Sequence, residues 1–179
     1  MSHGYALFDT AIGRCGLRWT DEGICGACFP EADEATTRSR LARHGGRETE
    51  RPPHIVAAMS RIAALLAGAA DDLADIELDL AGVPQFQQRV YAVARAIPPG
   101  RTLTYGEVAE RLGDKLAARA VGEALGRNPI PIIVPCHRVL AASGRTGGFS
   151  APGGVASKLK LLQIEGALSV NALPLFGGG

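Results

Sequence analysis

The chain has 179 residues, and its composition, 46% hydrophobic and 21% charged, excludes an intrinsically disordered protein. It shows neither an apolar run of the roughly 18 residues that span a membrane nor an N-terminal signal peptide, so we expect a soluble, cytoplasmic protein. The net charge of +1 conceals an asymmetry, because residues 1–81 hold 8 Arg against 13 Asp or Glu, and residues 82–179 hold 11 Lys or Arg against 5 Asp or Glu. Such an asymmetry favours a basic half that binds a polyanion, although charge also varies by chance along any chain.

The first half of the chain predicts a small sheet and a helix. Strand-like segments YALFDTAIG, RCGLRWT and GICGACF open it, and the turn DEG between the last two indicates an antiparallel meander. The polar, Gly/Pro-punctuated segment 31–53 indicates a surface connection with at most a short helix. Apolar residues at helical spacing from Ile55 to Leu66 predict an amphipathic helix over 53–66. The alternating segment DIELDL predicts a half-buried strand.

Three of the four cysteines lie in this half, and in a cytosolic chain we expect all four to be reduced thiols. CGAC at 25–28 has the CxxC spacing of a zinc-ligand pair or a redox pair. However, the chain has no second CxxC, and His3, His44 and His54 are isolated from one another. We therefore predict structural cysteines and no metal site.

The second half predicts a helical domain. AGVPQ marks the boundary, which divides the chain into domains of residues 1–81 and 82–179. Apolar spacing predicts a helix over 86–97, and TYGE at 104–107 fits a capping box that begins the next helix. KLAARAVGEALG predicts another short helix. Two short helices joined by a tight turn in the basic half are typical of a helix-turn-helix.

The second helix of this pair carries unusually small side chains. Ala118, Ala120 and Gly122 flank Arg119, which is its one long protruding group. A smooth helix with a single arginine suits close approach to a narrow DNA groove, where the arginine enters the base stack. An Ala-rich packing helix with a solvated arginine explains the same residues, and from the helix alone we favour that interpretation.

A cysteine and a histidine stand side by side in PIIVPCHRVL at 131–140. A thiol attacks as its thiolate, so a nucleophilic Cys136 needs a base or a positive charge nearby, and His137 and Arg138 are candidates for these roles. Adjacent side chains often point apart, however, and a core cysteine after a strand fits the same run. The dipeptide alone leaves a nucleophile, a metal ligand and a buried spacer open.

Two downstream segments bear on this choice. SGRTGGFSAPGG at 143–154 is a glycine-rich loop suited to covering a ligand, but it lacks the GxxxxGK[ST] pattern of a phosphate loop. SKLKLLQIEGA predicts a helix with Glu165 on its apolar side, where a carboxylate needs a partner. Cys136, His137 and Glu165 together suit a nucleophile, a base and the group that orients the base.

From about Phe86 to Ala167 the chain resembles the O6-alkylguanine-DNA alkyltransferases, that is, the methylated-DNA–protein-cysteine methyltransferases. TYGEVAERLG, AARAVG, RNPIPIIVPCHRVL and GGFS…LLQIEG carry the resemblance, and PCHRV after a helix with RAVG is highly specific. With the N-terminal pattern, the resemblance implies an α/β (α+β) fold. A meander sheet with a helix would be followed by a winged helix-turn-helix-like domain that binds DNA and carries the active site.

The resemblance also implies DNA repair by direct reversal. O6-alkylguanine, mainly O6-methylguanine, would be flipped out of the duplex, with O4-methylthymine as a further substrate. The alkyl group would pass irreversibly to Cys136 in a single turnover. No cofactor is implied, and the partner would be double-stranded DNA, bound through its minor groove by a monomer.

The family's catalytic residues correspond to residues of this sequence one by one. His137 would act as the base through a bound water, with Glu165 orienting its ring. Asn128 would brace the turn between the recognition helix and the active-site segment. Tyr105 would press on the phosphate of the target nucleotide and donate a hydrogen bond to the departing base.

The DNA-binding helix and the base pocket are implied as well. Arg119 would be the finger that fills the stack after the guanine leaves, and its small neighbours would allow close approach to DNA. The residues lining the guanine pocket would be Val139, Phe149 and Ser150. Phe149 stands where some members have a tyrosine whose hydroxyl contacts O6, so that donor is missing here.

Two other functions fit parts of the sequence. A non-catalytic protein that binds lesions through a helix-turn-helix would lack the cysteine, so Cys136 argues against it. A cysteine hydrolase would use Cys136, His137 and Glu165 but would not need a basic helix-turn-helix. The sequence leaves open which alkyl group is preferred and whether the alkylated form has a regulatory role.

Overall fold

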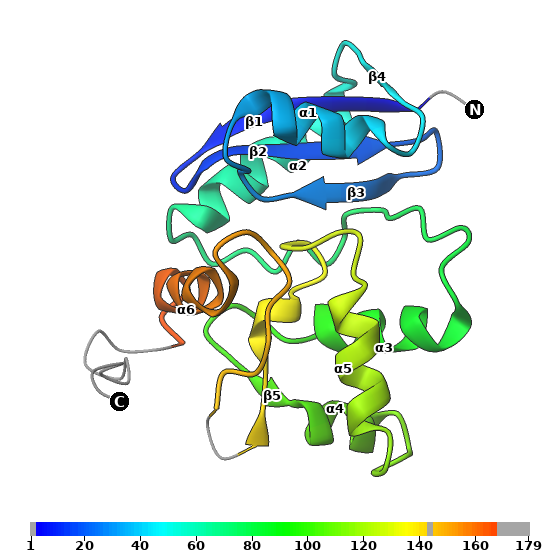
Figure 1. The fold of residues 1–179 in the computed structure, drawn as a ribbon, viewed down its shortest axis with the longest axis vertical. Coiled ribbons are helices and arrows are strands. Elements are labelled where there is room, and N and C mark those ends of the chain that lie inside the picture. The colour runs from blue at the N-terminus through cyan, green and yellow to red at the C-terminus, as the bar shows by residue number, and fades with distance from the viewer. Residues whose placement is uncertain (1–2, 143–144, 168–179) are drawn as a thin grey trace.

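The computed structural model describes residues 3–142 and 145–167, and the predicted α/β fold is confirmed (Figure 1). Its N-terminal half is a four-stranded sheet in the order β3-β2-β1-β4. The strands are β1 (Gly4–Thr10), β2 (Gly13–Trp19), β3 (Ile24–Cys28) and β4 (Arg47–Glu48). The helices of this half are α1 (Glu34–Ala42) and α2 (Pro53–Leu66).

The two helices cover opposite faces of the sheet. Successive residues of a strand point to opposite faces, so Leu7 and Phe8 of β1 lie on different sides. Leu7 clusters with Leu41 of α1, whereas Phe8 belongs to the cluster that contains Ile62 of α2. In Figure 1, α1 lies in front of the sheet and α2 behind it. The predicted antiparallel meander and the helix over 53–66 are both confirmed.

The polar connection between the meander and α2 is more ordered than we expected. It holds α1, which Asp33 caps by accepting a hydrogen bond of 2.7 Å from the Thr36 amide. It also holds the short strand β4, which pairs in parallel with β1. The helix cap and the strand pairing therefore order the backbone of this polar segment.

The prediction of a strand at DIELDL is wrong. The segment makes a single bridge, between Ile24 and Leu78, and otherwise belongs to no strand. The carbonyl groups around it are taken by a side chain, because Nη2 of Arg95 donates to the carbonyl oxygens of Leu73 and Ile76 at 3.0 and 2.8 Å. The pairing of the segment with β3 is limited to two backbone hydrogen bonds, both made by Ile24, so it is too short to form a strand.

The C-terminal half is mainly helical and follows the predicted order. Its helices are α3 (Gln85–Arg95), α4 (Tyr105–Arg111), α5 (Ala118–Gly126) and α6 (Gly154–Ile164). Strands β5 (Leu103–Thr104) and β6 (Val139–Leu140) pair in parallel beside them. The capping box is confirmed, since Thr104 and Glu107 exchange hydrogen bonds of 2.7 and 3.0 Å. Helices α4 and α5 pack together as a helix-turn-helix.

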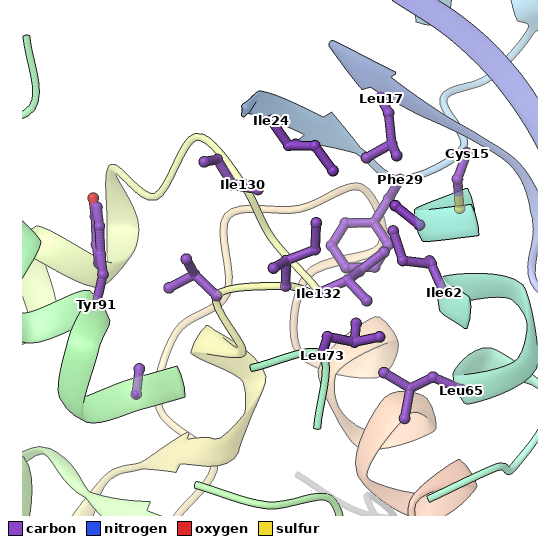
Figure 2. Packing of buried hydrophobic residues seen from close by; sticks show 14 of the residues in the cluster. Cys15, Leu17, Ile24, Phe29, Ile62, Leu65, Leu73, Tyr91, Ile130 and Ile132 are labelled. Atoms are coloured by element: carbon purple, nitrogen blue, oxygen red, sulfur yellow. The ribbon is translucent and has the colours of Figure 1, made fainter. Parts of the chain in front are cut away.

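The two halves share one hydrophobic core. Figure 2 shows Phe29 of the N-terminal half among Leu17, Ile62 and Ile132, the last of which belongs to the C-terminal half. A backbone hydrogen bond of 3.0 Å also joins the Ala27 amide of β3 to the Pro129 carbonyl. The division after residue 81 stays a prediction.

Parts of the predicted elements lie outside the described residues. These are residues 143–144 of the glycine-rich loop and residues 168–179 at the end of the second predicted domain. Within the part of the chain that the structure describes, no helix is both long and apolar enough to cross a membrane.

Candidate active site

The segment that leads to Cys136 is a tight, braced turn. Asn128, just after α5, donates from Nδ2 to the Val134 carbonyl at 2.8 Å and accepts at Oδ1 from the Ile130 amide at 2.9 Å. Between these contacts, Ile132 has φ of 76°, a left-handed conformation that costs a β-branched residue about 1–3 kcal/mol. Asn128 thus fixes the end of α5 to the active-site segment, in the position that the sequence predicted for it.

Cys136 opens a one-turn 3-10 helix, η1 (Cys136–Arg138), and is half-buried. Burial raises the pKa of its thiol, while a hydrogen bond with Asn128 and the charge of Lys158 act in the opposite direction without cancelling it. The resting group is therefore a neutral thiol at neutral pH, and it needs a base to become a nucleophile.

His137 and Glu165 meet in the interior, as the sequence predicted. His137 Nε2 lies 2.8 Å from Glu165 Oε1, and the two side chains are only 1% and 4% exposed. Arg138 adds a bidentate contact, with Nε to Oε2 at 3.0 Å and Nη2 to Oε1 at 2.8 Å. Burial opposes ionisation of Glu165, but the hydrogen bonds from His137 and Arg138 outweigh it and lower the pKa of the carboxyl group to about 2.

These contacts fix the protonation of His137. Burial lowers the pKa of the imidazole, although Glu165 partly offsets this effect, so the ring is neutral at pH 7. Because the carboxylate is ionised, Nε2 carries the ring proton and Nδ1 keeps a basic lone pair. Nδ1 is buried and has no hydrogen-bond partner among the described residues. The ring of His137, the residue that follows Cys136, therefore has one nitrogen that is free to accept a proton.

Lys158 is a functional candidate to which sequence reasoning assigned no role. Its ammonium group is fully buried and donates to the carbonyl oxygens of Val139 at 2.6 Å and Gly148 at 3.4 Å. Burial lowers its pKa to about 8, partly opposed by Cys136, and Nζ lies 5.7 Å from the centre of the Tyr105 ring. The signal in the sequence was its place on the apolar side of α6, which is the same signal that singled out Glu165.

A cavity of about 510 Å³ opens beside Cys136. It lies between the helix-turn-helix and the described part of the glycine-rich loop. Its lining residues are Tyr105, Gly122, Leu125, Gly126, Cys136, Gly148, Phe149 and Ser150. The loop runs close over Tyr105, because a Cβ on Gly147, where φ is +69°, would lie 2.8 Å from the Tyr105 hydroxyl. Glycine is therefore required where the loop closes the cavity.

The structure brings together most of the predicted pocket residues but not all of them. Tyr105, Phe149 and Ser150 line this cavity with Cys136. Val139 is fully buried, and neither this cavity nor a second one of about 140 Å³ is lined by it. The second cavity also touches Cys136, and it lies between β3, α1 and the loop.

The outer face of α5 presents the predicted DNA-binding residues. The Arg119 side chain is 93% exposed and pairs loosely with Glu123 at 3.5 Å. Ala120 is exposed, and Ala118 and Gly122 are half-buried. Of these small residues Gly122 lines the larger cavity, so the cavity and the arginine belong to the same helix. The turn before α5 also exposes Leu116, at 93%.

The CGAC segment is part of the N-terminal sheet. It forms most of β3, in which Cys25 and Cys28 point to opposite faces of the sheet. Burial raises the pKa of both thiols, to about 11 for Cys28. Across residues 3–142 and 145–167, no group of three or more His, Cys, Asp or Glu side chains is arranged to hold a metal ion.

Comparison with known proteins relates this site to a family. The family model for the DNA-binding domain of 6-O-methylguanine DNA methyltransferase matches residues 85–167. A methylated-DNA–protein-cysteine methyltransferase of Mycolicibacterium paratuberculosis is 47% identical over 128 residues, which cover 72% of this chain and 75% of the relative. A methyltransferase of the same name from Methanosarcina acetivorans is 35% identical over 170 residues, which cover 91% of this chain and 98% of the relative.

Solved structures agree with the sequence comparison. The OGT protein of Mycobacterium tuberculosis, crystallised in complex with DNA, superposes with a TM-score of 0.75 at 36% identity, covering 92% of this chain and 93% of that one. The O6-methylguanine-DNA methyltransferase of Pyrococcus kodakaraensis superposes with a TM-score of 0.69 at 28% identity, covering 92% of this chain and 99% of that one. The chain belongs to the methylated-DNA–protein-cysteine methyltransferase family.

Proposed function

We propose that this protein repairs DNA by transferring the alkyl group of O6-alkylguanine irreversibly to its own Cys136. One observation carries the proposal: Cys136 lines a cavity whose wall includes residues of α5, and the residue after it, His137, forms a buried pair with Glu165. O6-methylguanine is the main substrate, and O4-methylthymine is a further one.

The proton of the thiol leaves through His137. A water between the two groups passes the proton from Cys136 to Nδ1, the ring nitrogen that has a free lone pair. The ionised Glu165 stabilises the imidazolium that forms, and Arg138 holds the carboxylate in place. The imidazolium of His137 and the carboxylate of Glu165 are both buried, so proton transfer to His137 depends on Glu165 being held in place.

The thiolate then attacks the alkyl carbon in a single displacement. The carbon–sulfur bond forms as the carbon–O6 bond breaks, and the bonding electrons go to the guanine, which takes up a proton. Tyr105 lines the cavity and is the donor that assists the departing base. The product is a thioether on Cys136, a poor leaving group with no second nucleophile to remove it, so each molecule reacts once.

Access to the lesion requires the nucleotide to leave the duplex. O6 of guanine lies inside the base stack, so the base must be flipped into the cavity before the thiol can reach it. The small residues of α5 allow close approach to the minor groove, and Arg119 fills the gap in the stack. One chain supplies all of these groups, which supports a monomer as the active form.

The two halves of the chain have different roles in the proposed function. We assign DNA binding and alkyl transfer to a domain of residues 82–179 and a structural role to a domain of residues 1–81. The formal charges of +6 and −5 from the residue counts support this division, because DNA attracts the basic half. All four cysteines are free, which fits a reducing compartment such as the cytoplasm.

Intact-mass spectrometry tests the proposal directly. The protein is mixed with a duplex that contains one O6-methylguanine, and the product is mapped by peptide analysis. We expect one added methyl group per protein, located on Cys136, and none in the Cys136→Ser variant. A protein that binds the duplex but acquires no methyl group would instead be a lesion-binding module.

A further inference from the structure

We infer that Phe29 is a positioning residue for alkyl transfer, because it holds Phe149 and with it the loop that forms one wall of the larger cavity. The inference rests on the proposed function. The N-terminal half then takes part in positioning the reaction, in addition to the structural role proposed above.

The two rings make a direct contact between the halves of the molecule. Phe29 directly follows β3, is only 4% exposed, and lies in the shared core (Figure 2). Its ring centre lies 5.8 Å from that of Phe149, with an angle of 66° between the planes, which is an edge-to-face pair. Phe149 lines both cavities that touch Cys136. The ring pair therefore connects the core of the sheet with the reaction site.

The loop has few other anchors. Ser150 Oγ donates to the Gly126 carbonyl at 3.3 Å, and Lys158 donates to the Gly148 carbonyl at 3.4 Å, which are long hydrogen bonds. The stronger contacts lie at the end of the loop next to α6, where the Gly154 amide donates to the Ala151 carbonyl and Ser157 Oγ donates to the Pro152 carbonyl at 2.6 Å. Around Phe149 itself, the aromatic contact is therefore a main tether of the loop over the cavity.

The end of β3 also contacts the active-site turn. The Ala27 amide donates to the Pro129 carbonyl at 3.0 Å, directly after Asn128, the residue that braces the active-site turn. Two residues farther on, Phe29 contacts the loop. One short stretch of the N-terminal half therefore contacts both the active-site turn and the loop, and Phe149 of this loop lines the larger cavity, where the flipped base must fit.

Substituting Phe29 tests this role against a matched core residue. Phe8 of β1 is also a buried phenylalanine of the shared core, at 6% exposed, but it lines neither cavity. Phe29→Leu and Phe8→Leu both remove a ring from the core and should lower stability comparably. Only Phe29→Leu should lower the single-turnover rate constant of methyl transfer from saturating duplex, by about three- to tenfold.

Two further readouts separate positioning from general damage. The affinity of Phe29→Leu for the duplex should equal that of the wild type, because α5 is unchanged. The midpoint of its pH–rate profile should also be unchanged, because His137 and Glu165 are untouched. A loss of duplex affinity matching the loss of rate would overturn the inference.

Substituting Phe149, the loop residue of the ring pair, gives a second test of the contact. Phe149→Leu, at a half-buried position, should lose the same factor as Phe29→Leu, and the double variant should lose little more than either one. The inference is overturned if the two losses multiply, or if Phe29→Leu is no slower than Phe8→Leu. These outcomes leave the proposed function standing, since methylation of Cys136 in the wild type decides that separately.

Discussion

At the scale of single residues, the site depends on one carboxylate that serves two partners. Glu165 accepts hydrogen bonds from both His137 and Arg138, which keeps it ionised in the interior. The sequence suggested that Arg138 would supply positive charge to the cysteine, but its guanidinium is committed to Glu165 and to the Ile97 carbonyl. In the proposed mechanism, Arg138 therefore affects the thiol only indirectly, by holding the carboxylate that pairs with His137.

Glu165→Gln should slow methyl transfer by about 100-fold, because a neutral amide cannot stabilise the imidazolium that His137 must become. It should also lower the free energy of unfolding by about 3 kcal/mol, since Arg138 loses its buried counter-charge. Single-turnover kinetics and urea denaturation measure the two effects. Glu110→Gln, on exposed α4 surface, is the control. A transfer rate equal to that of the wild type would remove Glu165 from the mechanism.

Acid should destabilise the protein in two steps. Burial lowers the pKa of His137 below 6.5, so as pH falls through 6.5 the unfolded chain binds a proton that the native state does not. Each such proton lowers the free energy of unfolding by up to about 1.4 kcal/mol per pH unit. The lowered pKa of Glu165 adds a second loss as pH falls from 4.5 toward about 2. Urea denaturation at a series of pH values measures both, and His137→Asn should abolish the first step. If that variant keeps the first step, the titrating group is a different one.

At the scale of elements, the proposed function assigns DNA recognition to α5 and the chemistry to the active-site turn. Asn128, just after α5, joins the two through its hydrogen bonds to Val134 and Ile130. The capping box at Thr104 starts α4 with Tyr105 as its first residue, which fixes this side chain at the cavity. Local hydrogen bonds therefore position both the active-site turn and Tyr105.

Arg119→Ala should slow repair of duplex DNA by about tenfold, the size expected when one arginine contact to DNA is lost. Reaction with the free base O6-methylguanine should be nearly unchanged, because a free base needs no flipping. Comparing the two rate constants measures the effect, with Arg43→Ala at the end of α1 as a control. Equal losses on the two substrates would show that Arg119 is not the finger.

At the scale of the whole molecule, the charge asymmetry of the sequence predicts how the protein meets DNA. The excess positive charge lies in the second half of the chain, and phosphate contacts release counterions when they form. Duplex affinity should therefore fall by at least about tenfold between roughly 50 and 200 mM salt, whereas the rate with free O6-methylguanine should not change. Fluorescence anisotropy with a labelled duplex measures the affinity. A salt-independent affinity would argue against binding driven by phosphates.

Much of the fold follows from local patterns in the sequence. Helical spacing gave α2 its observed bounds of Pro53–Leu66, and the TYGE segment forms the capping box that its residue types require. These features depend on neighbours within one or two turns, which a sequence displays directly. The alternating segment DIELDL misled, because its pairing with β3 is limited to two hydrogen bonds of Ile24, and a local pattern does not show how far two distant segments pair.

The candidate site also combines features that the sequence displays with features that depend on the tertiary structure. The sequence by itself determined that Cys136 adjoins His137, that Arg119 stands among small side chains on a helix, and that one side of α6 is apolar, because each is a matter of residue type and spacing. Only the tertiary structure decided that Arg138 pairs with Glu165, that the Lys158 ammonium is buried, and that Phe29 packs on Phe149. Those contacts join segments far apart in the chain. They form because a buried charge is unfavourable unless it is paired, and because aromatic rings are stabilised by packing against each other.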